Sequence, residues 1–453
     1  MTVTADPRDS VASALEVDHV ESHLHPVSSF DLDDHPMPTG REEIWRFTPL
    51  KRLAGALDDT PGDADALSVE TIGDASYVVG TLARGQAPRG VALVPDDRAS
   101  ALASKHAGDA VHVKVPADAE LAEPIGHRVT GTAGTRTHRH TVIEAGTHSR
   151  ATYVLDHRGS GVHAGNVEVV VGDGADLTVV TLQDWDDDAV HVGTHEAVVG
   201  RDARYRHISV TFGGSVVRTS ANVHYAGPGG EAELLGLYFA DAGQHFEHRL
   251  FVDHNAPRTK SNVVYKGALQ GEKARTVWIG NVLIRKVAEA IETYEENRNL
   301  VLTDGCQADS VPNLEIETGE IEGAGHASAT ARFDDEQLFY LRSRGVSDEE
   351  ARRLVLHGFF QDQVGEHTVA VTRDGDEVFA LQDLCSHAAV SLSEGEVAGG
   401  TLECWLHGSC FDLRTGKPTG LPATEPVATF PVQVKDGDIF IDTTTTLNGV
   451  TPT

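Results

Sequence analysis

The sequence predicts a mainly β protein in which a long stacked β-solenoid is followed by a small, separate β domain. Between residues 91 and 331, short β-branched runs alternate with Gly and Asp turns, and no long helical period interrupts them. A weak repeat recurs in this region roughly every 24 to 29 residues. After Phe360 the pattern changes to short strands of alternating hydrophobicity. These three observations predict the two β regions.

The repeat is carried by four similar segments, three of which follow a Gly-containing turn. They are Ala151-Thr-Tyr-Val-Leu, Ala175-Asp-Leu-Thr-Val-Val, Ala203-Arg-Tyr-Arg-His-Ile and Ala232-Glu-Leu-Leu-Gly-Leu. A nearly constant period of this size is typical of a solenoid, whose repeats bury a core only against each other. A wide antiparallel sandwich can produce a similar pattern, so the repeat favours the solenoid without excluding the sandwich.

A chain of 453 residues is too long for one ordinary core, and two or three domains are expected. We expect a partly helical region over 1–90, a β core over 91–331, a helix pair over 332–361 and a small β domain over 366–445. In the first region, residues 11–20 can be helical, and residues 41–57 predict a small amphipathic element that Pro49 kinks or divides.

The helix pair is predicted over residues 334–360. Ser347 and Glu350 form a capping box at the start of the second helix. That helix carries Ala351, Val355 and Phe359 on one apolar stripe, together with Leu354. Such a stripe usually packs on its own domain, and docking of a partner is the alternative.

The composition limits the partners and the compartment. Lys+Arg 37 against Asp+Glu 69 gives a net charge of -32, which repels nucleic acid and anionic membranes. No run of 18 apolar residues is present, and the N-terminal residues lack the features of a signal peptide. Four cysteines are too few for a disulfide framework in so long a chain and are expected to be metal ligands or buried thiols. We expect a cytoplasmic protein.

The C-terminal β domain contains a possible metal centre. Cys385-Ser-His387 is followed, after sixteen residues, by Cys404-Trp-Leu-His407. Two thiolates can hold one iron and two imidazoles the other, which is the ligation of a Rieske [2Fe–2S] centre. The same donor set also suits tetrahedral Zn²⁺. The surroundings favour the cluster, because Ser409 can donate to a cluster sulfur and residues 416–422 form a stiff cover.

Residues 369–442 resemble the Rieske ferredoxin family on these motifs. Val390 and Leu406 stand where high-potential members have a disulfide, and Phe411 stands where they have a tyrosine donor. With fewer hydrogen bonds to the sulfurs, we expect a potential towards the low end of the range of about -150 to +300 mV. The segment before the first strand also departs from the family, so one edge of the domain is expected to be missing. Cys410 is expected to be a packed thiol.

The larger region resembles the SufD family of scaffold subunits for iron–sulfur cluster assembly. The resemblance rests on PTGREEIWRFTPL (38–50), DHNAPRTKSNVVYKGAL (253–269), ENRNLVLTDGCQADSVPNLEIETGEIEGAGHASAT (296–330) and FYLRSRGVSDEEARRLVLHGFF (339–360). It implies a right-handed parallel β-helix with flanking helical segments, a SufB-like sister scaffold and a SufC-like ATPase. It also makes residues 334–360 the expected docking surface for the ATPase. The sequence has no phosphate-binding P-loop, so ATP hydrolysis is expected in the partner.

Within this resemblance, His326 matches the histidine placed at the scaffold interface, where a neutral imidazole can ligate iron or a nascent cluster. Cys306 is expected to be a small buried residue, and sulfur transfer is the alternative. The pairs His138/His140 and His23/His25 resemble metal spacings only loosely and are expected to be solvated.

Two functions remain at this point. The first is a non-catalytic SufD-like scaffold subunit that binds iron or a nascent cluster transiently and carries a Rieske domain for electron transfer with a donor or acceptor. The alternative is a Rieske electron-transfer protein of an oxygenase or reductase system, tethered through a β-helix. Partners that co-purify with the chain distinguish the two.

Overall fold

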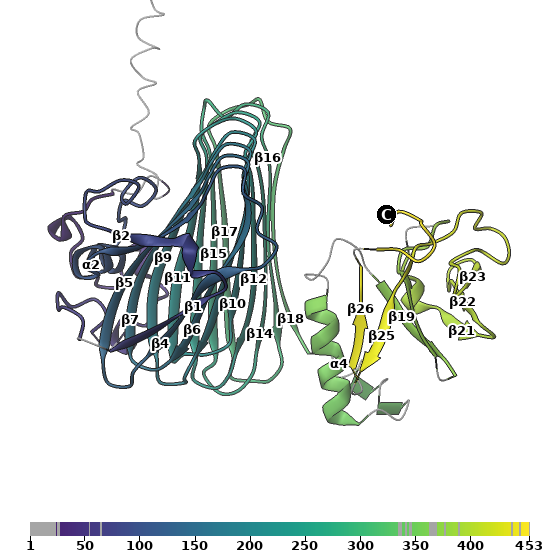
Figure 1. Ribbon diagram of the computed structural model, residues 1–453. Coiled ribbons are helices and arrows are strands. Elements are labelled where there is room, and N and C mark those ends of the chain that lie inside the picture. The colour runs from purple at the N-terminus through teal and green to yellow at the C-terminus, as the bar shows by residue number, and fades with distance from the viewer. Residues whose placement is uncertain are drawn as a thin grey trace, which may run out of the picture. The chain divides into compact units, whose positions relative to one another are not determined.

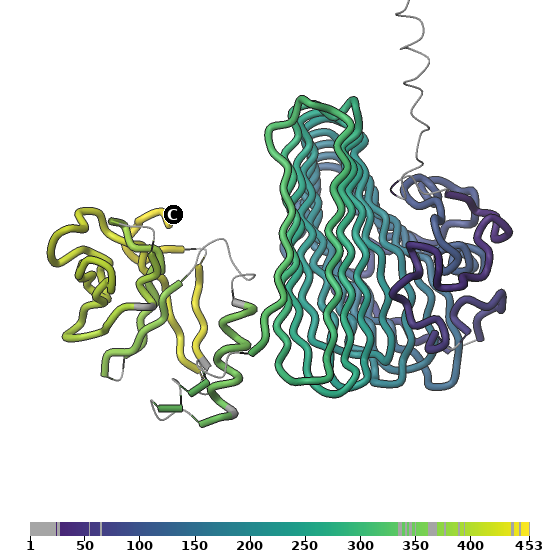
Figure 2. The backbone as a smooth tube through the Cα atoms, turned by 180° about the vertical axis from the view of Figure 1, so that it is seen from behind, coloured from purple at the N-terminus to yellow at the C-terminus, as the bar shows by residue number. Residues whose placement is uncertain are grey.

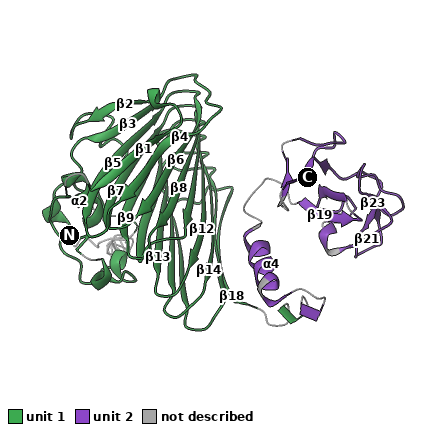
Figure 3. Cartoon of the chain, turned by 60° about the horizontal axis from the view of Figure 1, so that its bottom comes forward, with its two compact units in different colours: residues 1–340 green, residues 341–453 purple. Residues whose placement is uncertain are grey.

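The computed structural model describes residues 24, 28–53, 55–63, 66–333, 338–339, 342–343, 347–361, 369–375, 377–387, 390–435, 438–443 and 445–452. The chain divides into two compact units, residues 1–340 and residues 341–453 (Figure 3). The helix expected within residues 11–20 lies outside the described residues. No helix in the described part combines the length and the apolar character needed to cross a bilayer.

Two nine-stranded sheets form the walls of the first unit, and the chain alternates between them (Figure 1). One sheet contains, in spatial order, β1 (Leu67–Ile72), β4 (Ile125–Gly131), β6 (Arg150–Gly159), β8 (Asp176–Trp185), β10 (Arg204–Thr211), β12 (Glu231–Ala240), β14 (Lys260–Leu269), β16 (Glu292–Val301) and β18 (Gly323–Arg332). The other contains β17 (Gln307–Ile316), β15 (Arg275–Ile284), β13 (His245–His254), β11 (Val216–Tyr225), β9 (Val190–Val199), β7 (Val162–Val171), β5 (Arg136–Ala145), β3 (Ala110–Val115) and β2 (Val78–Leu82).

Neighbouring strands are parallel, except that β1 pairs antiparallel with β4 and β2 with β3. This is a parallel β-helix whose turns stack on one another (Figure 2). The solenoid predicted from the repeat is therefore confirmed, and the antiparallel sandwich is excluded.

The strand register explains the sequence repeat. Arg150 is the register partner of Asp176, Asp176 of Arg204, and Arg204 of Glu231. The four recurring segments therefore occupy the same place in successive turns of one sheet. A residue in one turn lies directly against its counterpart in the next, and the repeat buries a core between the sheets in this way.

Glycines give large core side chains their space. Gly236 is the register partner of Tyr265, and Gly267 is the register partner of Tyr238. A Cβ atom on Gly267 would lie 1.8 Å from Tyr238 Cε2, and one on Gly236 would lie 2.0 Å from Tyr265 Cδ1. Each buried tyrosine ring therefore occupies the volume that a side chain on the neighbouring strand would need.

The N-terminal segment is less regular than predicted. Residues 41–57 form the 3₁₀ helices Glu43–Trp45 and Leu50–Arg52, divided at Pro49 as expected, and do not form a longer amphipathic helix. Further 3₁₀ helices are Leu32–Asp34 and Ala75–Tyr77, and α2 (Arg98–His106) packs on β5 and β7. Trp45 is held by tertiary contacts, because the guanidinium of Arg218 lies 4.0 Å from its ring centroid and donates a 2.8 Å hydrogen bond to Asp97.

Glu168 of β7 attaches the segment between β2 and α2 to the β-helix. Its buried carboxylate accepts hydrogen bonds from the backbone N–H groups of Gly90 and Leu93, at 2.8 and 3.2 Å to Oε2. His140 Nε2 lies 2.7 Å from the other carboxylate oxygen. Buried charges are stable only with such partners, so this carboxylate fixes where the segment lies.

The second unit contains α4 (Asp348–Gln361) and three small antiparallel sheets. The sheets are β19 (Val369–Asp374), β20 (Glu377–Gln382) and β24 (Thr429–Phe430); β21 (Glu396–Ala398), β22 (Thr401–Glu403) and β23 (Cys410–Asp412); and β25 (Val432–Lys435) with β26 (Asp438–Ile441). A 3₁₀ turn lies at Leu392–Glu394. The strands predicted after Phe360 are confirmed.

Half of the predicted capping box of α4 is found, because the carboxylate of Glu350 accepts hydrogen bonds from Arg353. Ser347 Oγ accepts a 3.2 Å hydrogen bond from the Glu350 N–H group. On the predicted stripe Ala351 is buried, whereas Leu354 is exposed. Only Leu338, Phe339, Arg342 and Ser343 are described for the first helix of the pair, so most of that prediction lies outside the described residues.

We predict that Glu168→Ala lowers the free energy of unfolding by about 3 kcal/mol, because the buried N–H groups lose their acceptor. Urea denaturation followed by far-UV circular dichroism measures this change. Glu231→Ala is the control, because Glu231 pairs with Arg204 at 3.0 Å on the surface and contributes only about 0–1 kcal/mol. Equal effects of the two substitutions would contradict the role of Glu168.

Candidate metal centre

The four predicted ligands lie on two loops of the second unit. Cys385 and His387 lie between β20 and β21, and Cys404 and His407 lie between β22 and β23. The two imidazole rings are 5.0 Å apart between centroids. The side chains differ in exposure, because Cys385 and Cys404 are only 4% and 1% exposed while both histidines are exposed. The loops therefore present two thiols inside and two imidazoles at the surface.

Backbone hydrogen bonds hold both loops in place. The Cys385 N–H group donates to the carbonyl oxygen of Val390 at 2.9 Å, and the Cys404 N–H group donates to that of Ser409 at 2.8 Å. The Gly408 N–H group donates back to the carbonyl oxygen of Cys404 at 2.9 Å. These bonds fix the backbone from which the side chains of the ligands project.

Ser409 has the environment that the predicted role requires. It is fully buried, and its Oγ accepts a 3.1 Å hydrogen bond from the Ala423 N–H group. Because the oxygen is the acceptor in this bond, the hydroxyl hydrogen is available to donate elsewhere. A buried donor of this kind stabilises the added negative charge on a reduced cluster.

The donor set suits a metal centre. All four cysteines of the chain are free thiols in the described structure, and Cys385 and Cys404 pack in an apolar cluster with Phe411 and Leu402. Two thiols and two imidazoles on neighbouring loops can bind iron in a [2Fe–2S] cluster or Zn²⁺. The geometry alone does not distinguish the two, because both ions take tetrahedral sulfur and nitrogen ligands.

Cys410 lies beside this centre with different properties. It is half-buried, and its Sγ lies 3.6 Å from the carbonyl oxygen of Gly408. Burial and the nearby carboxylate of Glu403 raise the pKa of the Cys410 thiol. It is therefore a protonated thiol at neutral pH, and it is less buried than the packed residue that the sequence predicts.

His326 lies on β18, the last strand of its sheet, with its side chain 44% exposed. Its register partner is Glu295 of β16, and Glu295 Oε1 lies 3.8 Å from His326 Nδ1. Glu295 is buried, and no hydrogen-bond partner for Oε1 is found among the described residues. Burial raises the pKa of Glu295 to about 8.

Sequence reasoning missed Glu295, because only the strand register places it one solenoid turn before His326. Cys306, which directly precedes β17, is half-buried, and its Sγ donates to the carbonyl oxygen of Gly271 at 3.2 Å. It lies near the same end of the β-helix and is less buried than predicted.

The two histidine pairs whose spacing resembles metal sites were predicted to be solvated, and the structure describes one of these pairs. His140 is buried and pairs with Glu168, so the prediction that it is solvated is wrong. The reason is that its side chain points towards the neighbouring strand β7. His138 is half-buried and lies 3.1 Å from the Thr60 carbonyl oxygen. His23 and His25 lie outside the described residues.

Comparison with known proteins gives two family matches. The family model described as "SUF system FeS cluster assembly, SufBD core domain" matches residues 127–359. The model described as "Rieske [2Fe-2S] domain" matches residues 348–431. The second match contains all four candidate ligands and Ser409, which favours a [2Fe–2S] cluster over zinc at this centre.

Several curated proteins are similar over most of the chain. An iron–sulfur cluster assembly SufBD family protein of Mycobacterium tuberculosis is 51% identical over 354 residues, which are 77% of this chain and 89% of that protein. One of Mycobacterium leprae has the same identity over 77% of this chain and 90% of its own length. One of Synechocystis is 28% identical over 192 residues, 42% of each chain.

Two solved ferredoxin structures resemble a small part of the chain. The ferredoxin of carbazole 1,9a-dioxygenase from Nocardioides aromaticivorans is 43% identical over 17% of this chain and 74% of its own, with a TM-score of 0.16. A ferredoxin of Sphingomonas yanoikuyae is 36% identical over 18% of this chain and 78% of its own, with a TM-score of 0.17. With TM-scores this low, these likenesses carry no argument.

We predict that the dithionite-reduced protein, purified anaerobically, gives a Rieske-type EPR signal that Cys404→Ser abolishes. The reason is that the substitution removes one of the two thiols expected to hold the inner iron. Cys410→Ser is the matched control and keeps the signal. A signal that persists in Cys404→Ser would show that this residue is not a ligand.

A second prediction concerns Glu295. Its folded pKa of about 8 lies above the ordinary glutamate pKa of 4.5, so the folded state holds a proton that the unfolded state releases between those pH values. The contribution of Glu295 to the free energy of unfolding therefore falls as the pH rises through that window, by at most about 1.4 kcal/mol per pH unit.

Glu295→Gln removes this titration. The stability of the wild type relative to this variant is expected to fall between about pH 5 and pH 8, as measured by urea unfolding at each pH. Exposed Glu292 lies on the same strand, and Glu292→Gln is the control that keeps the wild-type profile. Parallel pH profiles for wild type and Glu295→Gln would contradict the raised pKa.

Proposed function

Because the chain belongs to the SufBD family of iron–sulfur cluster assembly proteins and carries a Rieske domain, we propose that it is a non-catalytic scaffold subunit that moves electrons through its own cluster. The observation that carries this proposal is the presence in one chain of a SufBD β-helix and of loops with two buried thiols and two exposed imidazoles. The alternative, an electron-transfer protein merely tethered through a β-helix, is not supported, because the SufBD match covers half of the chain.

The open end of the β-helix supports a SufB-like sister scaffold as the partner. Among the described strands, β17 and β18 are the last of their sheets, and each pairs with a strand on one side only. Such edges present unpaired N–H and C=O groups to another strand. Polar atoms near this end also lack partners in the described structure, namely Glu295 Oε1, Trp278 Nε1 and Ser310 Oγ. A second β-helix extending the sheets would cover both features.

His326 is the proposed site for transient iron or a nascent cluster. It is half-exposed on the edge strand β18, where a ligand from a second chain can approach the same metal. The nearby Glu295 carboxyl, which keeps its proton at neutral pH because burial raises its pKa to about 8, offers an oxygen 3.8 Å from Nδ1 of this ring. One imidazole is too few to hold iron alone, so the site needs the partner scaffold to be complete.

In the Rieske domain, Cys385 and Cys404 are proposed to hold the inner iron and His387 and His407 the outer one. Ser409 is the proposed donor to a cluster sulfur. When bound, the cluster supplies one-electron transfer. The histidines are exposed, and Trp405 next to them is exposed as well, so a redox partner can approach the cluster from this side.

The remaining partners follow from the same proposal. The covalent link keeps an electron carrier at an effective concentration in the mM range near the scaffold. ATP hydrolysis is assigned to a SufC-like subunit, since the sequence lacks a P-loop, and α4 remains its expected docking element. The complex is proposed to work in the cytoplasm.

We predict that His326→Ala, placed in the chromosomal gene, lowers the activity of iron–sulfur enzymes in cells and the iron retained by the purified complex. Loss of a ligand is expected to weaken iron binding at least about tenfold. Co-purification of the SufB-like partner should be unchanged, because the strand edge is intact.

Thr330→Ala is the matched control, because Thr330 is exposed on the same strand and offers no imidazole. Normal enzyme activities in His326→Ala cells would show that this histidine is not the site. Purification without any scaffold partner, but with an oxygenase or flavin reductase, would overturn the proposed function itself.

A further inference from the structure

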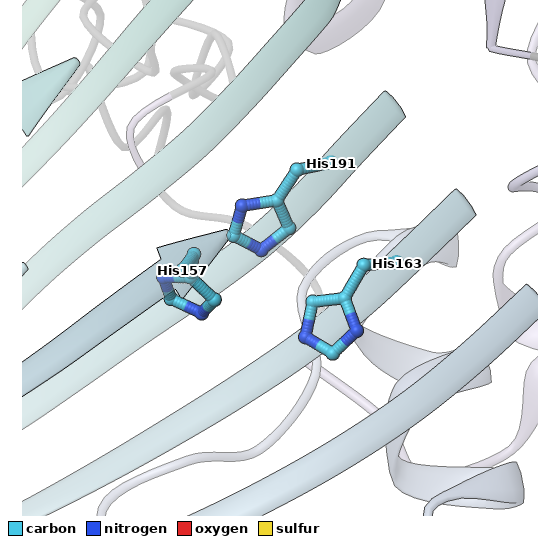
Figure 4. Close-up of side chains that lie close together, drawn as sticks. All are labelled: His157, His163 and His191. Atoms are coloured by element: carbon cyan, nitrogen blue, oxygen red, sulfur yellow. The ribbon is translucent and has the colours of Figure 1, made fainter. Parts of the chain in front are cut away.

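Three buried histidines meet inside the β-helix, far in sequence from the centre described above. His157, His163 and His191 come from β6, β7 and β9 and are only 3%, 2% and 2% exposed (Figure 4). Their ring centroids are 5.8 Å apart for His157–His163, 4.8 Å for His157–His191 and 5.0 Å for His163–His191. One ring nitrogen of each lies within 4.8 Å of the others.

The fold brings these rings together in two ways. His163 and His191 are register partners on neighbouring strands, so one ring lies directly beside the other. His157 lies near the end of β6, on the opposite sheet, and the short turn at residues 160–161 leads from β6 to β7. The rings therefore converge where the two sheets meet.

The Nδ1 atom of each ring is already engaged. His191 Nδ1 lies 2.7 Å from the side-chain oxygen of Gln183, and His157 Nδ1 lies 3.3 Å from the carbonyl oxygen of Leu182. Both of these partners are acceptors, so each Nδ1 carries the proton and each Nε2 carries a lone pair. The indole N–H group of Trp185 also lies 3.3 Å from His191 Nδ1, but its shorter hydrogen bond, at 2.7 Å, goes to the same Gln183 oxygen. His163 Nδ1 lies 2.7 Å from the Thr137 hydroxyl, which permits the same tautomer. Metal-binding histidines are usually held in this way.

Two glycines keep space beside the free nitrogens. Gly165 and Gly193 are register partners on β7 and β9. A Cβ atom on Gly165 would lie 3.1 Å from His163 Nε2 and 3.6 Å from His191 Nε2. A Cβ atom on Gly193 would lie 3.0 Å from His191 Nε2. A larger residue at either position would press on the nitrogens that the ring tautomers leave free.

Some of the electrostatic surroundings favour a bound cation at the three rings, and one nearby charge opposes it. Burial lowers the pKa of His157 to about 4 and the pKa of His163 and His191 well below the usual value, so all three rings are neutral, as metal ligands must be. The positive charge of Arg139 lowers the pKa of His157 and His163 further and opposes a cation. The exposed turn at residues 186–188 is Asp-Asp-Asp and attracts cations to this edge of the β-helix.

We propose that His157, His163 and His191 form a binding site for one divalent first-row transition metal ion, with an Nε2 ligand from each ring. Three imidazoles suit Zn²⁺ and Fe²⁺ and leave a fourth position open for water or an exogenous ligand. The site is separate from both centres assigned above. In the opposing explanation, the three neutral rings only pack against Trp185, whose ring centroid lies 5.2 to 5.6 Å from theirs.

Cobalt tests this proposal in the full-length protein with its [2Fe–2S] cluster assembled. Co²⁺, equilibrated for long enough to enter a buried site, should bind at about one equivalent per chain and give d–d absorption bands. A nitrogen-only site gives no thiolate-to-cobalt charge-transfer band, which would mark binding at the cysteines instead. Metal analysis of the protein as purified should find zinc or iron beyond the iron of the cluster.

His163→Gln and His191→Gln should each weaken cobalt binding at least about tenfold and remove the bands. Gly165→Ala keeps all three rings and should also weaken binding, because its methyl group would approach two of the nitrogens. His254→Gln is the control, because His254 is equally buried, is bonded through both ring nitrogens to Thr259 and Ser261, and lies outside the group.

Two outcomes would overturn the proposal. One is the absence of stoichiometric Co²⁺ binding by the wild type. The other is unchanged binding in folded His163→Gln, His191→Gln and Gly165→Ala proteins. If either glutamine variant fails to fold, the Gly165→Ala protein decides the result.

Discussion

The shared register of the parallel strands is the constraint on which the β-helix and its sites depend. Each strand lies against its predecessor with no shift, so a residue meets the residue one turn earlier. This places His191 against His163, and His326 against Glu295. A slip of one residue would turn every interior side chain outward. The polar and ionisable side chains of the first unit therefore meet as register partners on neighbouring strands.

The sequence was sufficient for the features that short patterns encode. The alanine-led repeat gave the solenoid, and the Cys-x-His and Cys-x-x-His spacings gave two loops that the fold does bring together. Features that depend on register could not be predicted, because Glu295 and His326 are distant in sequence and meet only once the strands are aligned. His140 was misjudged for the same reason, since its partner Glu168 lies on the next strand. The 3₁₀ turns near the N-terminus depend on tertiary contacts such as that of Arg218 with Trp45.

The C-terminal unit separates its candidate ligands by exposure. Its thiols lie in an apolar cluster, while its imidazoles face solvent. If this side holds the cluster sulfurs, as proposed, the exclusion of water makes a hydrogen bond from a buried donor such as Ser409 more important for the potential. The exposed imidazoles would shorten the path for an electron between the proposed cluster and a docked protein. The cysteines would thus shield the cluster from water, and the histidines would give a redox partner access to it.

The open end of the β-helix also has a consequence for folding. In a stack of repeats, each turn is stabilised by its neighbours, and the last turn has a neighbour on one side only. The side chains of β17 and β18 are correspondingly more exposed than those of the strands before them. Local opening of this end therefore costs less free energy than opening of the middle, and amide hydrogens exchange faster there. Docking of another β-helix, as proposed above, would supply the missing neighbour, so it would complete the folding of this end as well as the proposed iron site at His326.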